Sequence, residues 1–393
     1  MSINIRNCPN CNSEKNKSIF SKKLKNFDKF KLLCDYKIVQ CNDCNFIYNN
    51  NIDNKLLNEF YSKESLYSSD SSYGTGGNNS GDIKRYSTYM EILYRHLNHN
   101  SIICDVGCGK GGFIKFLLEQ KYNNSMGLEL DKRLIKLSGS DKILETKLYN
   151  YPLQDKKIDC FAFTHVFEHI LELQKVITEI SRCLKDDGLL FIEVPDAQNY
   201  SKKPVFDFYW FTIKEHINHF TLSSLNTFMN NNGFELIEKQ QSGIKYNNES
   251  YSYPSLRCLF KKTSQKMLRK NHIESFSLDS YINQEKEKTN IHKKEIHKIL
   301  RKYNYIYFWG IGQEFLTLTS FINIDISSQK IFLIDKNINK QNLTFENKKI
   351  CDPSSINLND PKNTCIIICS VFNNNIIKKD ILKFHKELHF YEI

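Results

Sequence analysis

The stretch SIICDVGCGKGGFIKFLLEQ, residues 101–120, decides the fold of the central part of the chain. It opens with a short apolar run typical of a buried strand and closes with a segment typical of a helix. Between them stands D-x-G-x-G-x-G, formed by Asp105, Gly107, Gly109 and Gly111. Glycines here let the backbone turn sharply and let a ligand approach the main chain. The stretch therefore predicts a ligand-binding turn between a strand and a helix.

Three more segments continue this pattern along the chain. NSMGLELD (residues 124–131) predicts a strand ending in Glu129, about 20 residues after the turn, where an acid can hold two ribose hydroxyls. KIDCFAFTHVFEHI (157–170) predicts a strand running into a helix, and CLKDDGLLFIEVPD (183–196) predicts a helix end, a turn and a strand. This alternation indicates an α/β fold with a doubly wound parallel sheet and its ligand at the carboxyl ends of the strands.

These motifs together resemble the class I S-adenosylmethionine-dependent methyltransferases. The resemblance rests on DVGCGKG, GLELD, FTHVFEHI and LKDDGLLFIEVP. It implies that three glycines lie under the methionine end of S-adenosylmethionine, that an aspartate supports their loop, that a glutamate holds the ribose and that a histidine lies beside the cofactor. The implied cofactor-binding residues are Asp105, Gly107, Gly109, Gly111, Glu129 and His165.

Two alternatives concern the same segments. Gly112 completes G-x-G-x-x-G with Gly107 and Gly109, so the glycines alone also permit a nicotinamide dinucleotide. The downstream HVFEHI and DDGLLFIEVP favour the methyltransferase. HVFEH lacks the H-E-x-x-H order of zinc peptidases, so we interpret His169 as a surface histidine.

Two C-x2-C pairs near the start of the chain predict a metal site. CPNC and CNDC are separated by 29 residues, a gap that a β-hairpin can span. Four thiolates complete a tetrahedral Zn²⁺ site with no open position, which indicates a structural role. Cys34 is a spare cysteine able to replace one ligand, and four unligated thiols are the weaker alternative. The predicted ligands are Cys8, Cys11, Cys41 and Cys44.

Composition limits where the chain works and what it binds. The 393 residues are enough for two or three domains, and the formal net charge is +11. Because Lys and Arg are scattered among acids, we interpret them mainly as a solvated surface, with a phosphate-bearing ligand or nucleic acid second. Without an apolar leader or an 18-residue apolar run, we expect a cytoplasmic protein that does not enter a membrane. In a reducing compartment, most of the cysteines outside the two pairs are interpreted as small buried apolar residues, such as Cys160, Cys365 and Cys369.

The last third predicts a second, smaller α/β unit. IYFWGIGQEFLTLTSFI contains a strand, a turn at Gly310 and Gly312, and a helix, and KIFLIDKN ends its strand at Asp335. A second nucleotide pocket and a packing domain are equally good interpretations. We expect a zinc-binding module over 1–60, the methyltransferase domain over 61–245 and a Rossmann-like α/β domain over 246–393.

This order of units resembles the nucleotide-sugar C-methyltransferases of deoxysugar pathways. The strand SYPSLRCLFKK carries Ser255 and Arg257 where that family has G-G-S-x-R, although Tyr253 and Pro254 replace its glycines. FWGIGQEF matches the family's W-G-x-G turn at its two glycines only. The resemblance covers nearly the whole chain and implies a nucleotide-activated sugar as the substrate.

The segment WFTIKEHINHFTL (residues 210–222) stands where that family has Y-H-E-H-x-x-Y-F-S. The resemblance implies that His216 is a general base and that Glu215 supports it. Ile213, Lys214 and His219 replace a tyrosine, a histidine and a tyrosine of the motif, which leaves carbon methylation open. We expect His219 to contact the substrate, although its apolar neighbours also fit a buried core position.

The sequence thus predicts an S-adenosylmethionine-dependent methyltransferase that contains structural Zn²⁺. Its expected acceptor is a nucleotide-activated sugar or a related small precursor of a surface polysaccharide. A nucleic-acid methyltransferase is the first alternative, although the N/D-P-P-Y motif of base-amino methylases is absent. A non-catalytic scaffold with a degenerate core is the second alternative. A monomer or a dimer fits the sequence equally well, as does methylation at carbon, oxygen or nitrogen.

Overall fold

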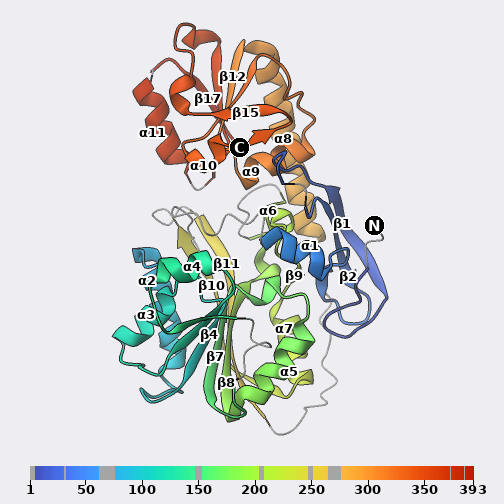
Figure 1. Cartoon of the computed structure of the whole chain (residues 1–393). Helices are drawn as coiled ribbons and strands as arrows, with labels where there is room; N and C mark the ends of the chain where they lie inside the picture. The colour runs from blue at the N-terminus through green and yellow to red at the C-terminus, as the bar shows by residue number, and fades with distance from the viewer. Residues whose placement is uncertain are drawn as a thin grey trace.

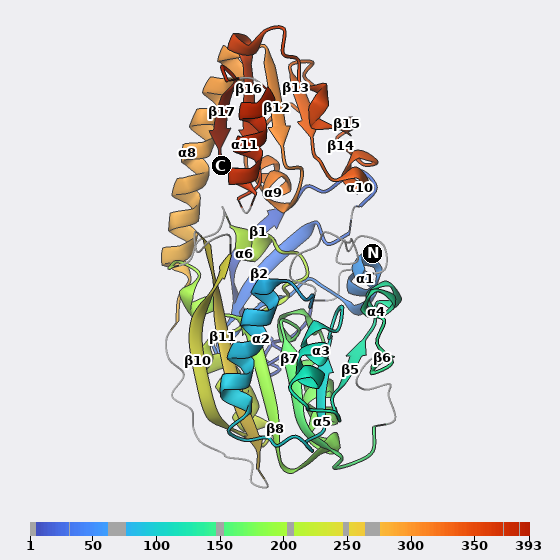
Figure 2. The ribbon, with the colours of Figure 1, turned by 90° about the vertical axis from the view of Figure 1, so that its left-hand side faces the viewer.

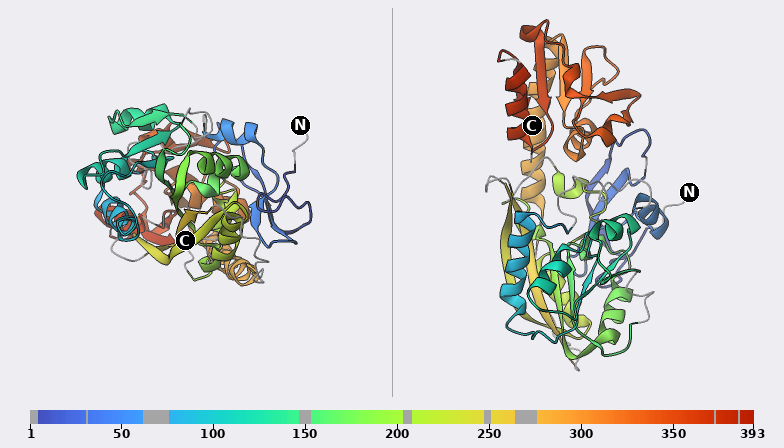
Figure 3. Two further views of the ribbon diagram at one scale, coloured as in Figure 1. Left: turned by 90° about the horizontal axis from the view of Figure 1, so that it is seen from below. Right: turned by 60° about the vertical axis from the view of Figure 1, so that its left-hand side comes forward.

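The computed structural model contains two α/β units and a smaller N-terminal unit beside them (Figure 1). Figure 3 shows the two α/β units stacked on one another, with the N-terminal strands at one side. The described residues are 5–30, 32–61, 76–146, 153–202, 208–246, 251–263, 276–371, 373–384 and 386–393. Within these ranges no helix has the length and apolar character needed to cross a membrane.

A seven-stranded sheet forms the central unit, in the order β10-β11-β8-β7-β4-β5-β6. Five neighbouring strands, β8 to β6 in that order, run parallel, while β11 runs antiparallel to both β8 and β10. The strands are β4 (Ile103–Val106), β5 (Met126–Glu129), β6 (Ile143–Glu145), β7 (Ile158–Thr164), β8 (Leu184–Pro195), β10 (Phe234–Tyr246) and β11 (Tyr251–Lys262).

Helices cover both faces of this sheet (Figure 1). Successive side chains of a strand point to opposite faces. Phe161 and Phe163 of β7 accordingly join the core under α5 and α7, whereas Cys160 and Ala162 join the core under α2 and α3. Each fully buried Phe contributes about 1.5–3 kcal/mol. The helices are α2 (Ser80–Leu93), α3 (Gly112–Glu119), α4 (Lys132–Ser138), α5 (Leu173–Cys183) and α7 (Leu222–Asn231).

The N-terminal unit is a four-stranded sheet in the order β1-β2-β3-β9. Its fourth strand comes from the segment 210–222, because β9 pairs with β3 through Ile47 opposite His219. The elements are β1 (Asn16–Lys23), β2 (Asp35–Cys41), β3 (Ile47–Asn49), β9 (Asn218–His219) and α1 (Asn54–Glu59). The segment expected to interact with substrate is therefore built into the sheet of the cysteine-bearing unit.

The C-terminal unit is a six-stranded sheet in the order β14-β15-β13-β12-β16-β17, and the long helix α8 runs alongside it (Figure 2). Thr212 of α6 joins this unit to the rest, since its carbonyl accepts from Gln313 Nε2 at 2.6 Å. Its strands are β12 (Tyr305–Trp309), β13 (Ile331–Ile334), β14 (Thr344–Phe345), β15 (Lys348–Cys351), β16 (Thr364–Ile368) and β17 (His389–Glu392). Its helices are α8 (Asp279–Lys302), α9 (Gln313–Phe321), α10 (Ile338–Gln341) and α11 (Asn374–Phe384), while α6 (Tyr209–Thr212) lies outside this unit and contacts α9.

Two expectations from the sequence are wrong here. The strand over 253–262 belongs to the central sheet as β11, where Leu256 and Phe260 are fully buried in its core, so the central unit extends past the expected boundary at residue 246. The helix expected after β7 is only a 3-10 turn, η3 (Phe167–His169). The run over 71–82 is rich in Gly, Ser and Asn, which is typical of a loop; its residues 71–75 lie outside the described residues, and α2 begins at Ser80.

Candidate active site

The glycine turn after β4 has the backbone that the sequence predicts. Gly107, Gly109 and Gly111 have φ angles of 71°, 57° and 73°, in the left-handed region that favours glycine. A Cβ added to Gly107 would lie 2.7 Å from Cγ2 of Val166, in the turn that follows β7. The two turns are therefore in contact at the carboxyl ends of adjacent parallel strands, where α/β sheets bind their ligands.

Asp105 lies under this turn and is 1% exposed. Burial, together with the charge of Glu129, raises the pKa of Asp105 to about 8. Among the described residues, its Oδ1 atom has no hydrogen-bond partner. A buried acceptor without a donor is costly, so the position suits a hydrogen-bond donor from a bound ligand.

Glu129 ends β5 and closes the glycine turn. Its Oε2 accepts from the backbone N–H of Gly109 at 2.8 Å, and Oε1 accepts from those of Leu130 and Asp131 at 2.6 and 3.0 Å. Burial raises its pKa, although these backbone donors oppose the shift. A carboxylate has about four acceptor sites, so Oε2 retains capacity for a ribose hydroxyl. The loop, Asp105 and Glu129 fit S-adenosylmethionine, which supplies an electrophilic methyl group when bound.

His165 follows β7 directly, with a φ of 58° that is unusual for a residue other than glycine. Its Nδ1 lies 3.1 Å from Oε1 of Glu168, and its Nε2 lies 3.4 Å from Oε2 of Glu193. Burial alone would lower the pKa of His165, but these two carboxylates raise it to about 9. His165 is therefore held as a cation between two buried acids at the sheet edge.

Glu193 of β8 is the functional neighbour that the sequence analysis missed. It is 0% exposed, and its Oε1 accepts from Ser255 Oγ and Arg257 Nε, both at 2.7 Å. Tyr89 also donates its hydroxyl to Oε2. Burial would raise the pKa of Glu193, but His165 and Arg257 hold it well below its usual value. A charged residue inside the apolar run FIEVP was the available signal, since such a residue needs partners.

The segment 210–222 brings its two histidines into the interior. His216 is 6% exposed, and burial with neighbouring histidines lowers its pKa well below the usual value. His219 is 1% exposed, contacts Tyr200 Oη through Nδ1 at 3.0 Å, and burial lowers its pKa to about 3. The half-buried Glu215 raises the pKa of Tyr61, after burial as the larger cause. The roles expected for these three residues stay predictions.

His169, expected at the surface, instead lies beside His216. Their ring centroids are 4.9 Å apart, and a carboxylate oxygen of Glu168 and one ring nitrogen of each histidine all lie within 4.8 Å of one another. The backbone N–H of Ile217 donates to the carbonyl of Glu168 at 2.9 Å and fixes the two segments together. The structure thus gathers three side chains of metal-ligand type next to the glycine turn.

The two cysteine pairs meet as the sequence analysis expected. The Sγ atoms of Cys8 and Cys44 are 3.5 Å apart, as are those of Cys11 and Cys41, and all four lie within 4.8 Å. A tetrahedral Zn²⁺ with bonds of about 2.3 Å separates its sulfur ligands by about 3.8 Å. The four thiols therefore fit zinc. Cys34 lies outside the group, with its Sγ donating to the carbonyl of Leu32 at 3.6 Å.

The cysteine-bearing unit also positions the His216 segment. Tyr36 of β2 places its hydroxyl 2.8 Å from the carbonyl oxygen of His216. Arg6 donates from Nη2 to the carbonyl of Ile217 at 2.6 Å and to Asn218 Oδ1 at 3.0 Å. The backbone around His216 is thus held by side chains from the other end of the chain.

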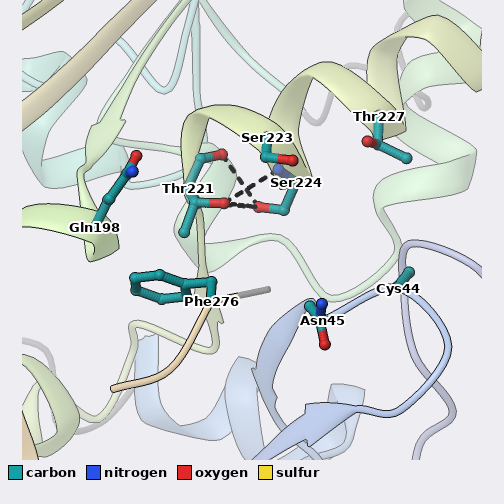
Figure 4. A pocket seen from close by; sticks show the side chains of 8 residues that line it. All are labelled: Cys44, Asn45, Gln198, Thr221, Ser223, Ser224, Thr227 and Phe276. Atoms are coloured by element: carbon teal, nitrogen blue, oxygen red, sulfur yellow. Dashed lines mark hydrogen bonds between the residues drawn. The ribbon is translucent and has the colours of Figure 1, made fainter. Parts of the chain in front are cut away.

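A small pocket next to the cysteine group has Cys44 in its lining (Figure 4). Thr221 and Ser224 form its wall and cap α7 through reciprocal hydrogen bonds. Apart from the thiol of Cys44, its lining consists of neutral groups, which offer little acid–base chemistry. The lining residues are Cys44, Asn45, Gln198, Thr221, Ser223, Ser224, Thr227 and Phe276.

The C-terminal unit has the same arrangement as the methyl-donor site, in which an acid at the end of one strand accepts a hydrogen bond from the glycine turn after the neighbouring strand. Asp335 follows β13, and its Oδ2 accepts from the backbone N–H of Ile311 at 2.8 Å, as Glu129 does from Gly109. Here Lys340 Nζ also binds Asp335 Oδ2, at 3.0 Å. The chain's own lysine therefore neutralises the acid that a nucleotide ribose would use.

Comparison with known proteins identifies the central unit, since residues 82–239 match a family model described as a methyltransferase domain. These residues form a class I S-adenosylmethionine-dependent methyltransferase domain. The α/β fold expected from the sequence is confirmed. The matched residues contain the glycine turn, Glu129 and the turn from His165 to His169.

The methyltransferase domain is similar to several proteins of distant sequence. The ubiquinone/menaquinone biosynthesis C-methyltransferase UbiE of Campylobacter jejuni strain 81-176 is 22% identical over 124 residues, 28% of this chain and 50% of that protein. The chain thus spans about half the length of this relative. A methyltransferase structure from Archaeoglobus fulgidus is 15% identical, with a TM-score of 0.37 over 53% of this chain and 100% of its own. A Haloferax volcanii putative methyltransferase in complex with the Trm112 activator has 13% identity and a TM-score of 0.38, over 47% and 95%.

Proposed function

We propose that this protein transfers the methyl group of S-adenosylmethionine to a small acceptor, with His216 as the base. The observation that carries this proposal is the turn after β7. Val166 of that turn touches the glycine loop, and His169 of the same turn touches His216. The histidine cluster therefore adjoins the place where the methyl donor fits, as a group-transfer site requires.

For methyl transfer, the protein must align the acceptor with the methyl group and remove a proton from the acceptor. His216 is neutral at pH 7 because its pKa lies well below the usual value, and its Nδ1 has no hydrogen-bond partner among the described residues. It takes the acceptor's proton while the acceptor's electron pair forms the bond to the methyl carbon. The electron pair of the broken carbon–sulfur bond remains on sulfur.

Water exclusion depends on aromatic packing around the cluster. Trp210 is 0% exposed and stacks on Tyr200 with ring centroids 4.9 Å apart. Its ring also meets that of Tyr253 at 4.7 Å, and Tyr253 meets His165 at 5.3 Å. The rings of Trp210, Tyr200 and Tyr253 thus form an aromatic layer next to His165, which limits the access of water to the reacting groups.

As the acceptor we propose a nucleotide-activated sugar or a related small precursor of a surface glycan. The formal net charge of +11 belongs mainly to a solvated surface, and a phosphate-bearing ligand is its second interpretation. The order of cysteine pairs, methyltransferase domain and C-terminal α/β unit, which resembles the nucleotide-sugar C-methyltransferases, supports the same class. Both alternatives, nucleic acid and a non-catalytic scaffold, give different results in the following assay.

The test measures transfer of labelled methyl groups from S-adenosylmethionine to nucleotide sugars, RNA and DNA. We expect transfer to a nucleotide sugar and a loss of about 10²- to 10⁴-fold in turnover for His216→Asn, the usual contribution of a general base. His99→Asn, in the exposed loop before β4, is the matched control and should keep full turnover. Transfer to bulk nucleic acid, or full activity in His216→Asn, would contradict the proposal. Deuterium exchange into the acceptor without methyl donor would indicate carbon methylation.

A further inference from the structure

We propose that Glu168, His169 and His216 hold a divalent transition-metal ion whose open positions bind oxygen atoms of the acceptor. The inference deepens the proposed function, because the ion would lie beside the methyl donor. It concerns a second metal site, separate from the four cysteines. Two imidazoles and one carboxylate are a donor set that binds Zn²⁺ or Fe²⁺ and leaves coordination positions open.

The spacing of the three donors suits such an ion after small side-chain rotations. One ligand atom from each residue lies within 4.8 Å of the other two. A tetrahedral ion with bonds of about 2.1 Å separates neighbouring ligand atoms by about 3.4 Å, so the donors must close by on the order of 1 Å. The T-shaped contact of the two rings, 76° between planes, allows nitrogens of both to face one point.

Two of the three donors, Glu168 and His216, are buried, and each has a possible ligand atom without a hydrogen-bond partner among the described residues, whereas His169 is half-buried. Glu168 is 0% exposed; its Oε1 contacts His165, while Oε2 has no hydrogen-bond partner in the described part of the chain. The Nδ1 atom of His216 is likewise buried without such a partner. Unpartnered polar atoms this deep in a protein are expensive unless a ligand or ion satisfies them.

The tautomer of His169 leaves its second ring nitrogen available as a ligand. Its Nδ1 lies 3.0 Å from the backbone carbonyl of Glu215, and because a carbonyl only accepts, Nδ1 carries the proton. A metal-binding histidine is typically oriented by such a contact. In the neutral ring, Nε2 then presents a lone pair 3.9 Å from a carboxylate oxygen of Glu168. This oxygen is Oε1, which already contacts His165, so the ion would be held by the unpartnered Oε2 of Glu168 together with Nε2 of His169.

The open positions define the chemical class of the acceptor. Three protein ligands leave room for a carbonyl oxygen or for two neighbouring hydroxyl oxygens, both of which sugars provide. When bound, the ion would occupy one nitrogen of His216 and would acidify a ligated acceptor hydroxyl, whose proton would pass to water on ligation. His216 takes the acceptor's proton directly only in the ion-free protein.

Metal content of the whole protein tests the site without any acceptor. Apoprotein is reconstituted with Co²⁺ alone, and bound metal is measured by mass spectrometry together with the visible absorption spectrum. We expect two ions per chain in the unmodified protein, one with a sulfur-to-cobalt band from the cysteines and one without. Glu168→Gln and His169→Asn should each bind one ion and keep the sulfur band.

Two comparisons keep the result decisive. His99→Asn, the matched control, should retain both ions, and each variant is checked for folding by its affinity for S-adenosylmethionine. In the unmodified protein, a mild chelator should remove one ion, which Co²⁺ then restores. Only one ion per chain in the unmodified protein, or two ions in both ligand variants, would overturn the proposal. Either result would leave His216 as the base, because that role is tested by turnover alone.

Discussion

Removing the Tyr36 hydroxyl tests how the cysteine-bearing unit positions the His216 segment. Tyr36 is 2% exposed, and its hydroxyl lies 2.8, 3.0 and 3.3 Å from the carbonyl oxygens of His216, Ile213 and Lys214. The hydroxyl has one proton, so it donates mainly to the closest of these, that of His216. Tyr36→Phe leaves that buried carbonyl without its donor and keeps the ring in place.

The expected cost follows from the buried carbonyl. Leaving such an acceptor unsatisfied costs about 1–3 kcal/mol, which raises the opening constant of the segment by about 5- to 150-fold. Hydrogen–deuterium exchange measures this locally. The amide of Ile217, bonded to the carbonyl of Glu168 at 2.9 Å, and that of His216, bonded to the carbonyl of Ile213 at 3.0 Å, should exchange faster by that factor.

Tyr48→Phe is the matched control. Tyr48 lies on the adjacent strand β3 and is 0% exposed, but its hydroxyl has no hydrogen-bond partner among the described residues. Removing that hydroxyl should leave exchange unchanged or slow it slightly, because an unsatisfied polar group is removed. Equal exchange in the two variants would refute the view that Tyr36 holds the segment through its hydroxyl.

Three further predictions concern the metal, the cofactor and pH. If the four cysteines hold zinc, Cys8→Ser should lose it and unfold more easily, whereas Cys34→Ser should keep the zinc content and the stability of the unmodified protein, as metal analysis and thermal unfolding will show. Glu129→Ala should weaken S-adenosylmethionine binding by about 10- to 100-fold in calorimetry, because a charged hydrogen bond contributes about 1.5–3 kcal/mol, and Glu145→Ala at the end of β6 should not. Burial lowers the pKa of His219 from 6.5 in the unfolded chain to about 3 in the folded protein. As the pH falls from 6.5 towards 3, only the unfolded chain gains this proton, so the free energy of unfolding should decrease by up to about 1.4 kcal/mol per pH unit. Denaturation of His219→Gln should show less of that loss, and an identical pH profile would contradict the assignment.

The sequence predicts those features whose geometry is local. The turn from Asp105 to Gly111 is one strand–helix connection, and its spacing alone requires left-handed glycine conformations. Each cysteine pair is likewise a short turn, and two such turns need only one hairpin to meet. Such motifs depend little on the rest of the fold, and for this reason the methyltransferase domain was predicted.

Features formed by distant segments were not predictable in the same way. His169 meets His216 because residues 167–169 form a 3-10 turn, whereas a helix was expected there, and because β9 lies against it. Both depend on tertiary packing that no local pattern encodes. The strand β11 was placed in the wrong unit for a similar reason, since its partner β8 is more than fifty residues earlier in the chain.

The pairing of β9 with β3 limits how this protein can be recombined. An N-terminal module with its own metal site is the kind of unit that could be exchanged between proteins if it folded independently. Here its sheet is incomplete without β9 from the segment 210–222, and Arg6 and Tyr36 hold the backbone of that segment through hydrogen bonds. A chimera carrying a foreign module would inherit a zinc site but lose the register of His219 against Ile47. The two parts must therefore be inherited together, and substitutions on one side of this shared sheet constrain those tolerated on the other.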